Sequence, residues 1–102
     1  MSYRRVIRFE AEVDITDAAI WYQKQQKGLG DDFIAEVHST IERITANPRQ
    51  FPRLRRTPEV RRAFTNRFPY RVFFVLRPDS IHVFRVLHTA RRDSKWRRAV
   101  PK

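Results

Sequence analysis

The feature that most constrains the fold is an uninterrupted apolar run, Val72–Leu76, in the second half of the chain. Side chains alternate between the two faces of a strand, so Phe74 lies on one face of this run and Phe73 on the other. A strand that is apolar on both faces is typical of the interior of a sheet that is covered on both sides. The chain must therefore place a layer of structure on each face of a sheet.

A second β-prone run follows directly. Ile81–His88 is separated from Tyr70–Leu76 by Arg77-Pro78-Asp79-Ser80, in which Pro78 presets the backbone φ angle of a tight turn. The two runs predict a β-hairpin. The hairpin is also expected to be the most cationic part of the chain, because it is surrounded by Arg67, Arg71, Arg77, Arg85, Arg91 and Arg92, with His82 and His88 between them.

Two elements are predicted at the start of the chain. Residues 3–9 alternate imperfectly, as a first strand does. A helical period follows, ending near Lys27, and its shared face holds Ile15, Ala18, Ala19 and Tyr22. Asp14 or Thr16 is available as the helix cap. Gly28 suits the left-handed position that closes a helix, and Asp31 is a candidate cap for the next one.

The second helix has the clearest pattern, a stripe at three- and four-residue steps formed by Phe33, Val37, Ile41 and Ile44 and stopped by Asn47-Pro48. His38 is expected on its polar face. Residues 48–58 predict a surface loop, residues 60–65 a strand beside the hairpin, and residues 93–102 a short helix anchored by Trp96. The order strand, helix, helix, strand, strand, strand indicates one α+β domain, residues 1–102. An antiparallel helical hairpin covers one face of a mainly antiparallel sheet.

Composition narrows the class of protein. A chain of 102 residues is long enough for one domain with its own core. It has no cysteine, which excludes a disulfide framework and thiolate metal sites. No apolar run approaches the roughly 20 residues of a membrane span. We expect a cytoplasmic protein that does not enter the membrane.

The net charge of +11 is distributed unevenly along the chain. Residues 1–50 carry a net charge of −1 and residues 51–102 a net charge of +12, and thirteen of the fifteen cations in the second half are arginines. Arginine makes forked contacts with phosphate and carboxylate groups. The pattern predicts a polyanionic partner, either nucleic acid or an acidic protein segment. The alternative is a solvated cationic surface that keeps the protein soluble.

Several reaction classes are excluded by the residues. The cationic half has only three carboxylates, Glu59, Asp79 and Asp93, too few for a magnesium nuclease, and there is no phosphate-binding glycine loop. We therefore expect no metal and no cofactor. Cleavage of RNA without a metal stays possible, with Arg71, His88 and Arg91 supplying base, acid and charge stabilisation. The alternative for His88 is a structural hydrogen bond at the strand end, and for Trp96 a packing role in place of base stacking.

Short patterns occur in a fixed order along the chain: Phe9-Glu10-Ala11-Glu12-Val13-Asp14-Ile15, Trp21-Tyr22, Gly28-Leu29-Gly30, Phe33, Ile44–Pro48, Phe68-Pro69-Tyr70-Arg71-Val72-Phe73-Phe74 and Arg85-Val86-Leu87-His88-Thr89-Ala90-Arg91-Arg92-Asp93. In order and spacing, over nearly the whole chain, they resemble the RelE/ParE toxin superfamily of type II toxin–antitoxin systems, often labelled plasmid stabilisation proteins. The ending of the chain is more similar to ParE-like members, because residues 94–98 offer no tyrosine.

The resemblance implies a bacterial toxin that is held inactive by an antitoxin with an acidic or amphipathic C-terminal segment. It implies inhibition of DNA gyrase without an enzymatic site. The alternatives are RelE-like, metal-independent cleavage of mRNA on the ribosome, in which Arg71 and Arg91 match the arginine positions, or a degenerate binding module. Operator DNA is expected to be bound only through the antitoxin.

Two sets of binding residues are predicted. The residues expected to bind the target or nucleic acid are Arg61, Arg62, Arg71, Arg85, Arg91, Arg92 and Trp96. The residues expected to form an uncovered apolar face on which the antitoxin docks are Phe73, Val75 and Phe84.

Overall fold

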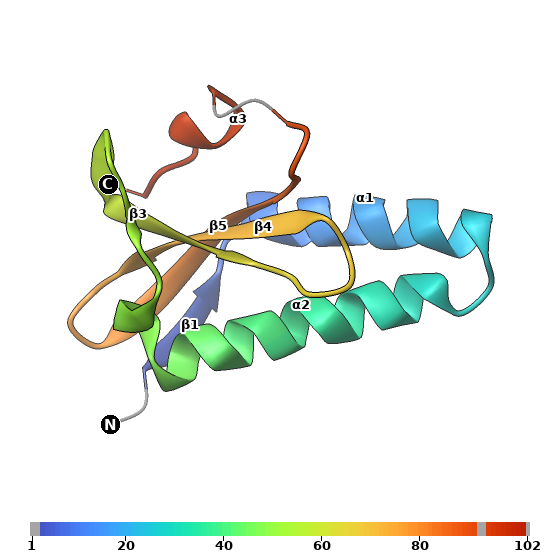
Figure 1. Ribbon diagram of the computed structural model, residues 1–102, viewed down its shortest axis with the longest axis horizontal. Helices are drawn as coiled ribbons and strands as arrows, with labels where there is room; N and C mark the ends of the chain where they lie inside the picture. Colours follow the sequence, from blue (N-terminus) through green and yellow to red (C-terminus); the bar gives the residue numbers. More distant parts are fainter. Residues whose placement is uncertain (1–2, 92–93, 102) are drawn as a thin grey trace.

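In a computed structural model, which describes residues 3–91 and 94–101, two helices cover one face of a five-stranded sheet and a short helix lies on the other face (Figure 1). The elements follow the chain as β1 (Arg4–Ile7), α1 (Phe9–Gln25), α2 (Leu29–Ala46), the 3₁₀ turn η1 (Pro48–Gln50), β2 (Arg53–Leu54), β3 (Thr57–Phe64), β4 (Tyr70–Leu76), β5 (Ser80–His88) and α3 (Ser94–Arg97). The predicted α+β order is confirmed, with the two-residue strand β2 added in the segment expected to be a loop.

The strands lie in the order β1-β5-β4-β3-β2, so β4 is the central strand, as the double-sided apolar run predicts. The predicted hairpin of β4 and β5 is antiparallel, and its turn is closed by the Arg77 N–H, which donates to the Ser80 carbonyl at 2.8 Å. Strand β3 pairs antiparallel with β4 on the other side. Strand β1 is the exception to the antiparallel pattern, because it runs parallel to β5.

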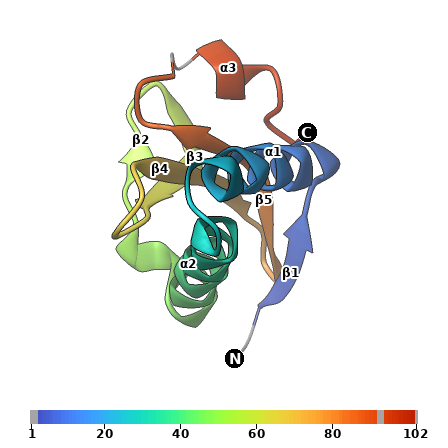
Figure 2. The ribbon, with the colours of Figure 1, turned by 90° about the vertical axis from the view of Figure 1, so that its right-hand side faces the viewer.

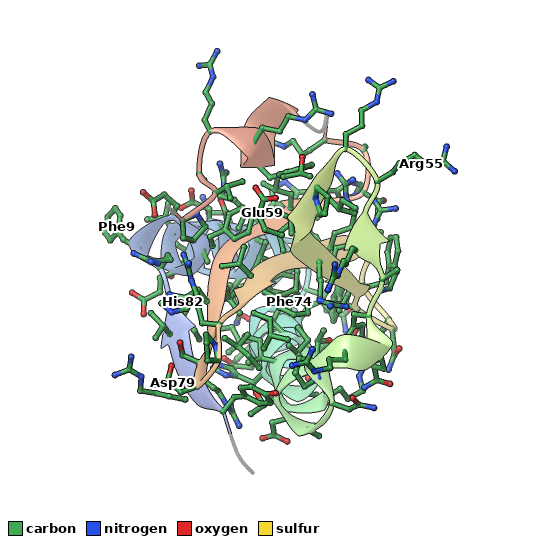
Figure 3. The ribbon with its side chains drawn as sticks, turned by 90° about the vertical axis from the view of Figure 1, so that its left-hand side faces the viewer. Phe9, Arg55, Glu59, Phe74, Asp79 and His82 are labelled. Atoms are coloured by element: carbon green, nitrogen blue, oxygen red, sulfur yellow. The ribbon has the colours of Figure 1, made fainter. Side chains whose placement is uncertain are left out.

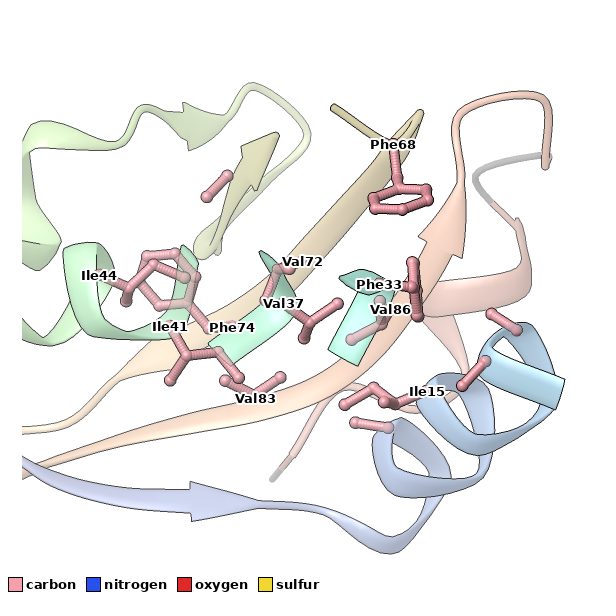
Figure 4. Close-up of a cluster of buried hydrophobic side chains, with 14 of the residues drawn as sticks. Ile15, Phe33, Val37, Ile41, Ile44, Phe68, Val72, Phe74, Val83 and Val86 are labelled. Carbon is pink, nitrogen blue, oxygen red and sulfur yellow. The ribbon is translucent and has the colours of Figure 1, made fainter. Parts of the chain in front are cut away.

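The larger half of the core lies between the sheet and the two helices (Figure 4). The predicted stripe of α2 is fully buried there, and Phe33, Val37, Ile41 and Ile44 face the sheet. The sheet contributes Val72, Phe74, Val83 and Val86 to the same cluster. His38, on the opposite side of α2, is exposed as predicted.

The other face of the sheet is covered by the end of the chain. Trp96 of α3 is only 2% exposed, and its ring stacks on Phe73 at 5.3 Å between centroids with an interplanar angle of 22°. Phe73, Val75 and Phe84 are all buried in this cluster, together with Leu87. The prediction that they form an uncovered face for the antitoxin is therefore wrong, because Trp96 and the residues after it occupy that face.

Helix α1 begins at Phe9, earlier than the sequence predicts. The cap residue is Arg8, which makes no side-chain capping hydrogen bond, so neither Asp14 nor Thr16 caps the helix. Asp31 is also not a cap. Helix α2 begins at Leu29 behind Gly28, which has the predicted left-handed conformation with φ of 90°, and Asp31 lies in the first turn.

The two helices approach each other closely at their connected ends, as the end-on view shows (Figure 2). A Cβ atom on Gly30 would lie 2.5 Å from the carbonyl oxygen of Ala19, so only glycine fits at this crossing. The side-chain oxygen of Gln23 accepts hydrogen bonds from the N–H groups of Gly28 and Gly30 at 3.1 and 3.2 Å. Neither these helices nor α3 has the length and apolar character needed to cross a membrane, as far as the described residues show.

Candidate functional site

A surface cavity of about 490 Å³ opens between α1 and the end of the β4–β5 hairpin. Helix α1 contributes five of its lining residues, the strands five, and the segment after β5 one. In chain order they are Asp14, Asp17, Ala18, Trp21, Tyr22, Tyr70, Arg85, Val86, Leu87, His88 and Arg91. Aromatic rings, carboxylates and cations therefore face the same space.

One wall of the cavity is an ion pair between α1 and β5. The Nε and Nη2 atoms of Arg85 donate to the two carboxylate oxygens of Asp14 at 2.7 and 2.9 Å. The backbone N–H of Val86 also donates to Asp14, at 2.9 Å. The hydrogen bonds from Asp14 raise the pKa of Arg85. Arg85 is thus engaged inside the chain, and its predicted role in binding a target is not supported by this position.

The floor of the cavity is aromatic. The rings of Tyr22 and Tyr70 meet edge-to-face with their centroids 6.2 Å apart, and burial raises the pKa of both phenols. Their rings also contact Phe33 and Phe68 in the core. Trp21 also lines the cavity, meets the Tyr22 ring in an edge-to-face contact and is 57% exposed. The cavity therefore presents a fixed aromatic floor and one freely accessible indole.

His88 lines the cavity and is the last residue of β5. Its Nδ1 atom accepts the N–H of Ala90 at 3.0 Å, and its ring meets Tyr70 edge-on at 5.3 Å. In the neutral ring the proton then sits on Nε2, and the lone pair that a general base needs is occupied. This is the structural hydrogen bond that the sequence leaves open as the alternative role of His88.

Of the other two residues predicted for RNA cleavage, Arg91 is exposed and lines the cavity, whereas Arg71 does not line it. Arg71 is only 6% exposed, and its Nη2 atom donates to the Arg91 carbonyl at 2.7 Å. Its guanidinium also lies over the Phe73 ring, on the α3 face of the sheet. His88 and Arg91 are therefore brought together, but Arg71 is held on the other side of the sheet.

The remaining predicted binding residues are scattered. Arg61 is buried and donates to the Phe51 carbonyl at 2.7 Å, and burial is the main reason why its pKa is lowered. Arg62 lies over the Phe64 ring on β3. Trp96 is a packing anchor, so it cannot stack on a base. Arg92 lies outside the described residues. The predicted cations thus do not form one surface.

The cavity contains residues that the sequence analysis did not single out as functional, among them Asp14, Trp21 and Tyr70. A signal for this region is nevertheless present in the sequence of α1. Phe9, Val13 and Ile20 follow at steps of four and seven residues, which places them on the side of the helix opposite the core. Phe9 is 74% and Ile20 50% exposed. We call Phe9, Val13 and Ile20 the outer stripe of α1. Nowhere in the described parts of the chain do three His, Asp or Glu side chains gather closely enough to hold a metal ion.

The comparison with protein families decides the identity of the fold. Residues 6–93 match the family model described as the ParE toxin of the type II toxin-antitoxin system, parDE. This chain belongs to the ParE toxin family. It is the toxin component of a type II toxin–antitoxin system, and a cognate antitoxin is its partner. The predicted ParE-like family is thus confirmed.

Solved structures agree on the fold. A chain described as the chromosomal ParDE TA system from P. aeruginosa superposes on this ParE-family toxin with a TM-score of 0.76 at 15% sequence identity. The match covers 85% of this chain and 96% of the other. At this identity the likeness speaks for the fold alone. A comparison with curated protein sequences finds no match.

Proposed function

We propose that this ParE-family toxin inhibits DNA gyrase in the cytoplasm by binding to it, without cutting nucleic acid itself. The proposal is supported by the hydrogen bonds that already engage the residues needed for cleavage. The Nδ1 atom of His88 already holds the Ala90 N–H, and the guanidinium of Arg71 is buried against the Arg91 carbonyl. Neither His88 nor Arg71 is therefore arranged to act as a base, and the cavity beside α1 is suited to holding a protein side chain.

The second candidate is cleavage of mRNA on the ribosome, as in RelE-like toxins. One observation favours it, because His88, Arg91 and the Tyr70 hydroxyl line a single cavity. A cleavage site of this kind needs an acid and a cation near the leaving oxygen. It also needs a base, which none of these three groups supplies in the observed hydrogen-bonding arrangement.

An assay with gyrase separates the two candidates. Toxin is incubated with gyrase, ATP and supercoiled plasmid, the mixture is denatured, and linear DNA that is covalently held by gyrase is measured. We expect trapped linear DNA, and we expect Trp21→Ala to reduce it by about tenfold or more because Trp21 is the exposed aromatic residue of the cavity.

The matched control is Ile20→Ala. Ile20 is 50% exposed, close to the exposure of Trp21, and it precedes Trp21 on α1 but does not line the cavity. If gyrase is unaffected by excess toxin while programmed ribosomes release cleaved mRNA, the second candidate replaces the first. If both variants lose gyrase activity equally, the cavity is not the contact site.

The antitoxin needs a different docking surface from the one that the sequence predicts, because Trp96 covers Phe73. We infer that an amphipathic segment of the antitoxin lies along the outer stripe of α1. Phe9 points away from the molecule (Figure 3), and α1 carries exposed apolar residues on its solvent side in addition to its buried core side. Exposed apolar rows of this kind on a small protein usually mark a partner surface.

This docking surface is tested by calorimetric titration of the antitoxin into Ile20→Lys. A charge in the middle of an apolar contact should weaken binding by about 100-fold. Ala35→Lys, which adds the same charge on the exposed side of α2, serves as the control and should bind like the unchanged toxin. Equal affinity of Ile20→Lys and the unchanged toxin would place the antitoxin elsewhere.

A further inference from the structure

The edge of the sheet opposite β1, formed by β2, is unusually rich in arginine. Residues 49–62, which run from η1 through β2 into β3, hold six arginines and one carboxylate, Glu59. Strand β2 is the edge strand, and Arg55 and Arg56 form the tip that joins it to β3. Most of these side chains are exposed, and Arg55 extends away from the molecule (Figure 3).

A hollow of about 300 Å³ lies at this tip. Four arginines line it, two from the tip, one from β3 and one from α3, and they are Arg55, Arg56, Arg62 and Arg97. The other described lining residues are Leu54, Thr57 and Trp96, so among the residues that the structure describes no carboxylate faces the hollow. Four positive charges around one opening create a strong local field for an anion.

Two of these guanidinium groups are held in place by aromatic rings. Arg62 lies over the ring of Phe64 at 5.3 Å, and Arg97 lies over the ring of Trp96 at 5.6 Å. In the described parts of the chain, no carboxylate forms an ion pair with any of the four arginines, whereas Arg67 and Arg85 each have an aspartate partner. Their N–H groups are thus oriented and available for an external anion.

A second hollow of about 570 Å³ continues the positive surface along the same edge. Arg49 and Arg53 line it beside Arg61, and Glu59 is the one acidic residue among its described lining residues. Repulsion from Arg53 and Arg49 adds to the effect of burial in lowering the pKa of Arg61. The potential in this region is therefore positive enough to act on a neighbouring arginine.

We propose that this edge binds the phosphate backbone of double-stranded DNA without reading its sequence. We call the residues concerned the basic edge: Arg49, Arg53, Arg55, Arg56, Arg62 and Arg97. A phosphodiester backbone needs only cations and N–H donors, and arginine supplies both. A protein segment would need apolar anchors as well, and here Trp96 is buried beneath Arg97. The choice of duplex DNA as the nucleic acid rests on the proposed action on gyrase.

The position of the basic edge leaves the cavity free. In the sheet order, β2 and β3 lie on one side of β4, while β5, which lines the cavity, lies on the other. Phe9 on α1 and Arg55 at the tip point away from opposite sides of the molecule (Figure 3). The toxin can therefore contact a protein through α1 and the cavity while the basic edge rests on DNA.

The test uses purified toxin, a fluorescent DNA duplex of arbitrary sequence and anisotropy measured over a range of salt concentrations, with no gyrase present. In Arg55→Gln/Arg56→Gln we expect about tenfold weaker binding at moderate salt. The slope of log affinity against log salt should fall in size by about 2, because two phosphate contacts are lost. The matched control is Arg4→Gln/Arg5→Gln, which removes the same two charges from exposed residues of the opposite edge strand β1.

We expect the control to bind like the unchanged toxin, and a second duplex of different sequence to bind equally well. Equal losses in the two double variants would show that net charge alone attracts DNA, and the proposal would fail. It also fails if the tip variant keeps its DNA affinity while it loses binding to a polyglutamate peptide or to single-stranded RNA. Since gyrase is absent, none of these outcomes depends on whether gyrase is the cellular target.

Discussion

At the scale of single residues, Asp14 links the helical layer to the sheet. Its carboxylate accepts hydrogen bonds from the Nε and Nη2 atoms of Arg85, which lies 71 positions further along the chain. It also accepts the N–H of Val86. Both partners are largely shielded, with 13% of the Asp14 side chain and 22% of the Arg85 side chain exposed. Removing one member of such a pair leaves a charge without compensation.

Asp14→Asn is therefore expected to lower the free energy of unfolding by about 2 kcal/mol, below the range for fully buried pairs because of the remaining exposure. Urea denaturation followed by circular dichroism measures the change. Asp17→Asn is the control, since Asp17 lies less than one turn further along α1 and lines the same cavity. A similar loss in both variants would mean that the cavity needs negative charge in general and not this pair.

Both ring nitrogens of His82 form hydrogen bonds. Arg8 donates to its Nδ1 atom at 3.2 Å, so the ring proton sits on Nε2 and is directed to the Ser80 hydroxyl at 3.0 Å. Burial, followed by repulsion from Arg8, Arg77 and Arg4, lowers the pKa of His82. A proton on Nδ1 would break the contact with Arg8.

Stability should therefore depend on pH through His82. The unfolded chain, whose histidine pKa is about 6.5, takes up this proton first as the pH falls. The contribution of His82 is complete above about pH 6.5 and is lost as the pH falls toward the lowered pKa of the folded state, with a slope of at most about 1.4 kcal/mol per pH unit.

Unfolding free energies measured from pH 7.5 to 5 should show this decrease, and His82→Gln should flatten it. His38→Gln, a change at the exposed histidine of α2, should leave the decrease intact. The same pH profile for His82→Gln and the unchanged protein would assign the decrease to other groups.

Most of these residue roles could not be predicted from the sequence. Asp14 is a residue type that often caps helices, so the sequence suggests that role. Its actual partner, Arg85, becomes a neighbour only when β5 is placed next to α1. The role of His88 could be narrowed to two alternatives, because a histidine at the end of a strand either forms a hydrogen bond that ends the strand or faces a ligand. The hydrogen bond with Ala90 decides between them, and it depends on the backbone path after the strand.

At the scale of elements, the helical hairpin depends on Gly30. In an isolated helix, replacing glycine by alanine is favourable by about 1 kcal/mol. Here the new Cβ atom would lie 2.5 Å from the Ala19 carbonyl, so the helices must move apart. We expect this overlap to dominate and Gly30→Ala to lower the free energy of unfolding by about 2 kcal/mol.

Thermal unfolding of Gly30→Ala provides the measurement, with Gly28→Ala as the comparison. No atom lies within 4 Å of a Cβ atom on Gly28, but its φ of +90° disfavours alanine, so the expected loss is only about 1 kcal/mol. A more stable Gly30→Ala would show that helix propensity outweighs the close approach.

The elements themselves could be predicted where their period was unambiguous, as in β4, β5 and α2. The start of α1 could not, because Phe9 continues the apolar pattern of β1 and the true cap, Arg8, has no capping side chain. The cover of the second sheet face was also missed. An apolar run requires a cover on each face, but only the fold shows that Trp96 reaches back to Phe73.

At the scale of the whole molecule, the outer stripe of α1 leaves the free toxin with an apolar surface. Without its antitoxin, the protein should therefore associate with itself at high concentration. Phe9→Gln/Ile20→Gln should reduce this association without loss of stability, since 74% of Phe9 and 50% of Ile20 is already exposed. Sedimentation velocity measures the mass distribution, and Phe64→Gln is the control. An unchanged mass distribution in the double variant would show that another surface causes the self-association.

The parallel pairing of β1 with β5 joins Arg4–Ile7 to Ser80–Val83. The first strand can therefore enter the sheet only after β5 has been synthesised. Contacts between such distant segments form slowly, because a long loop must close first. While the protein is being made, the ribosome has released most of the chain before β1 has a strand to pair with. The cavity between α1 and β5 cannot exist before that moment. A chain that has been synthesised only as far as β4 therefore lacks the β5 wall of the cavity, which forms long after α1 has left the ribosome.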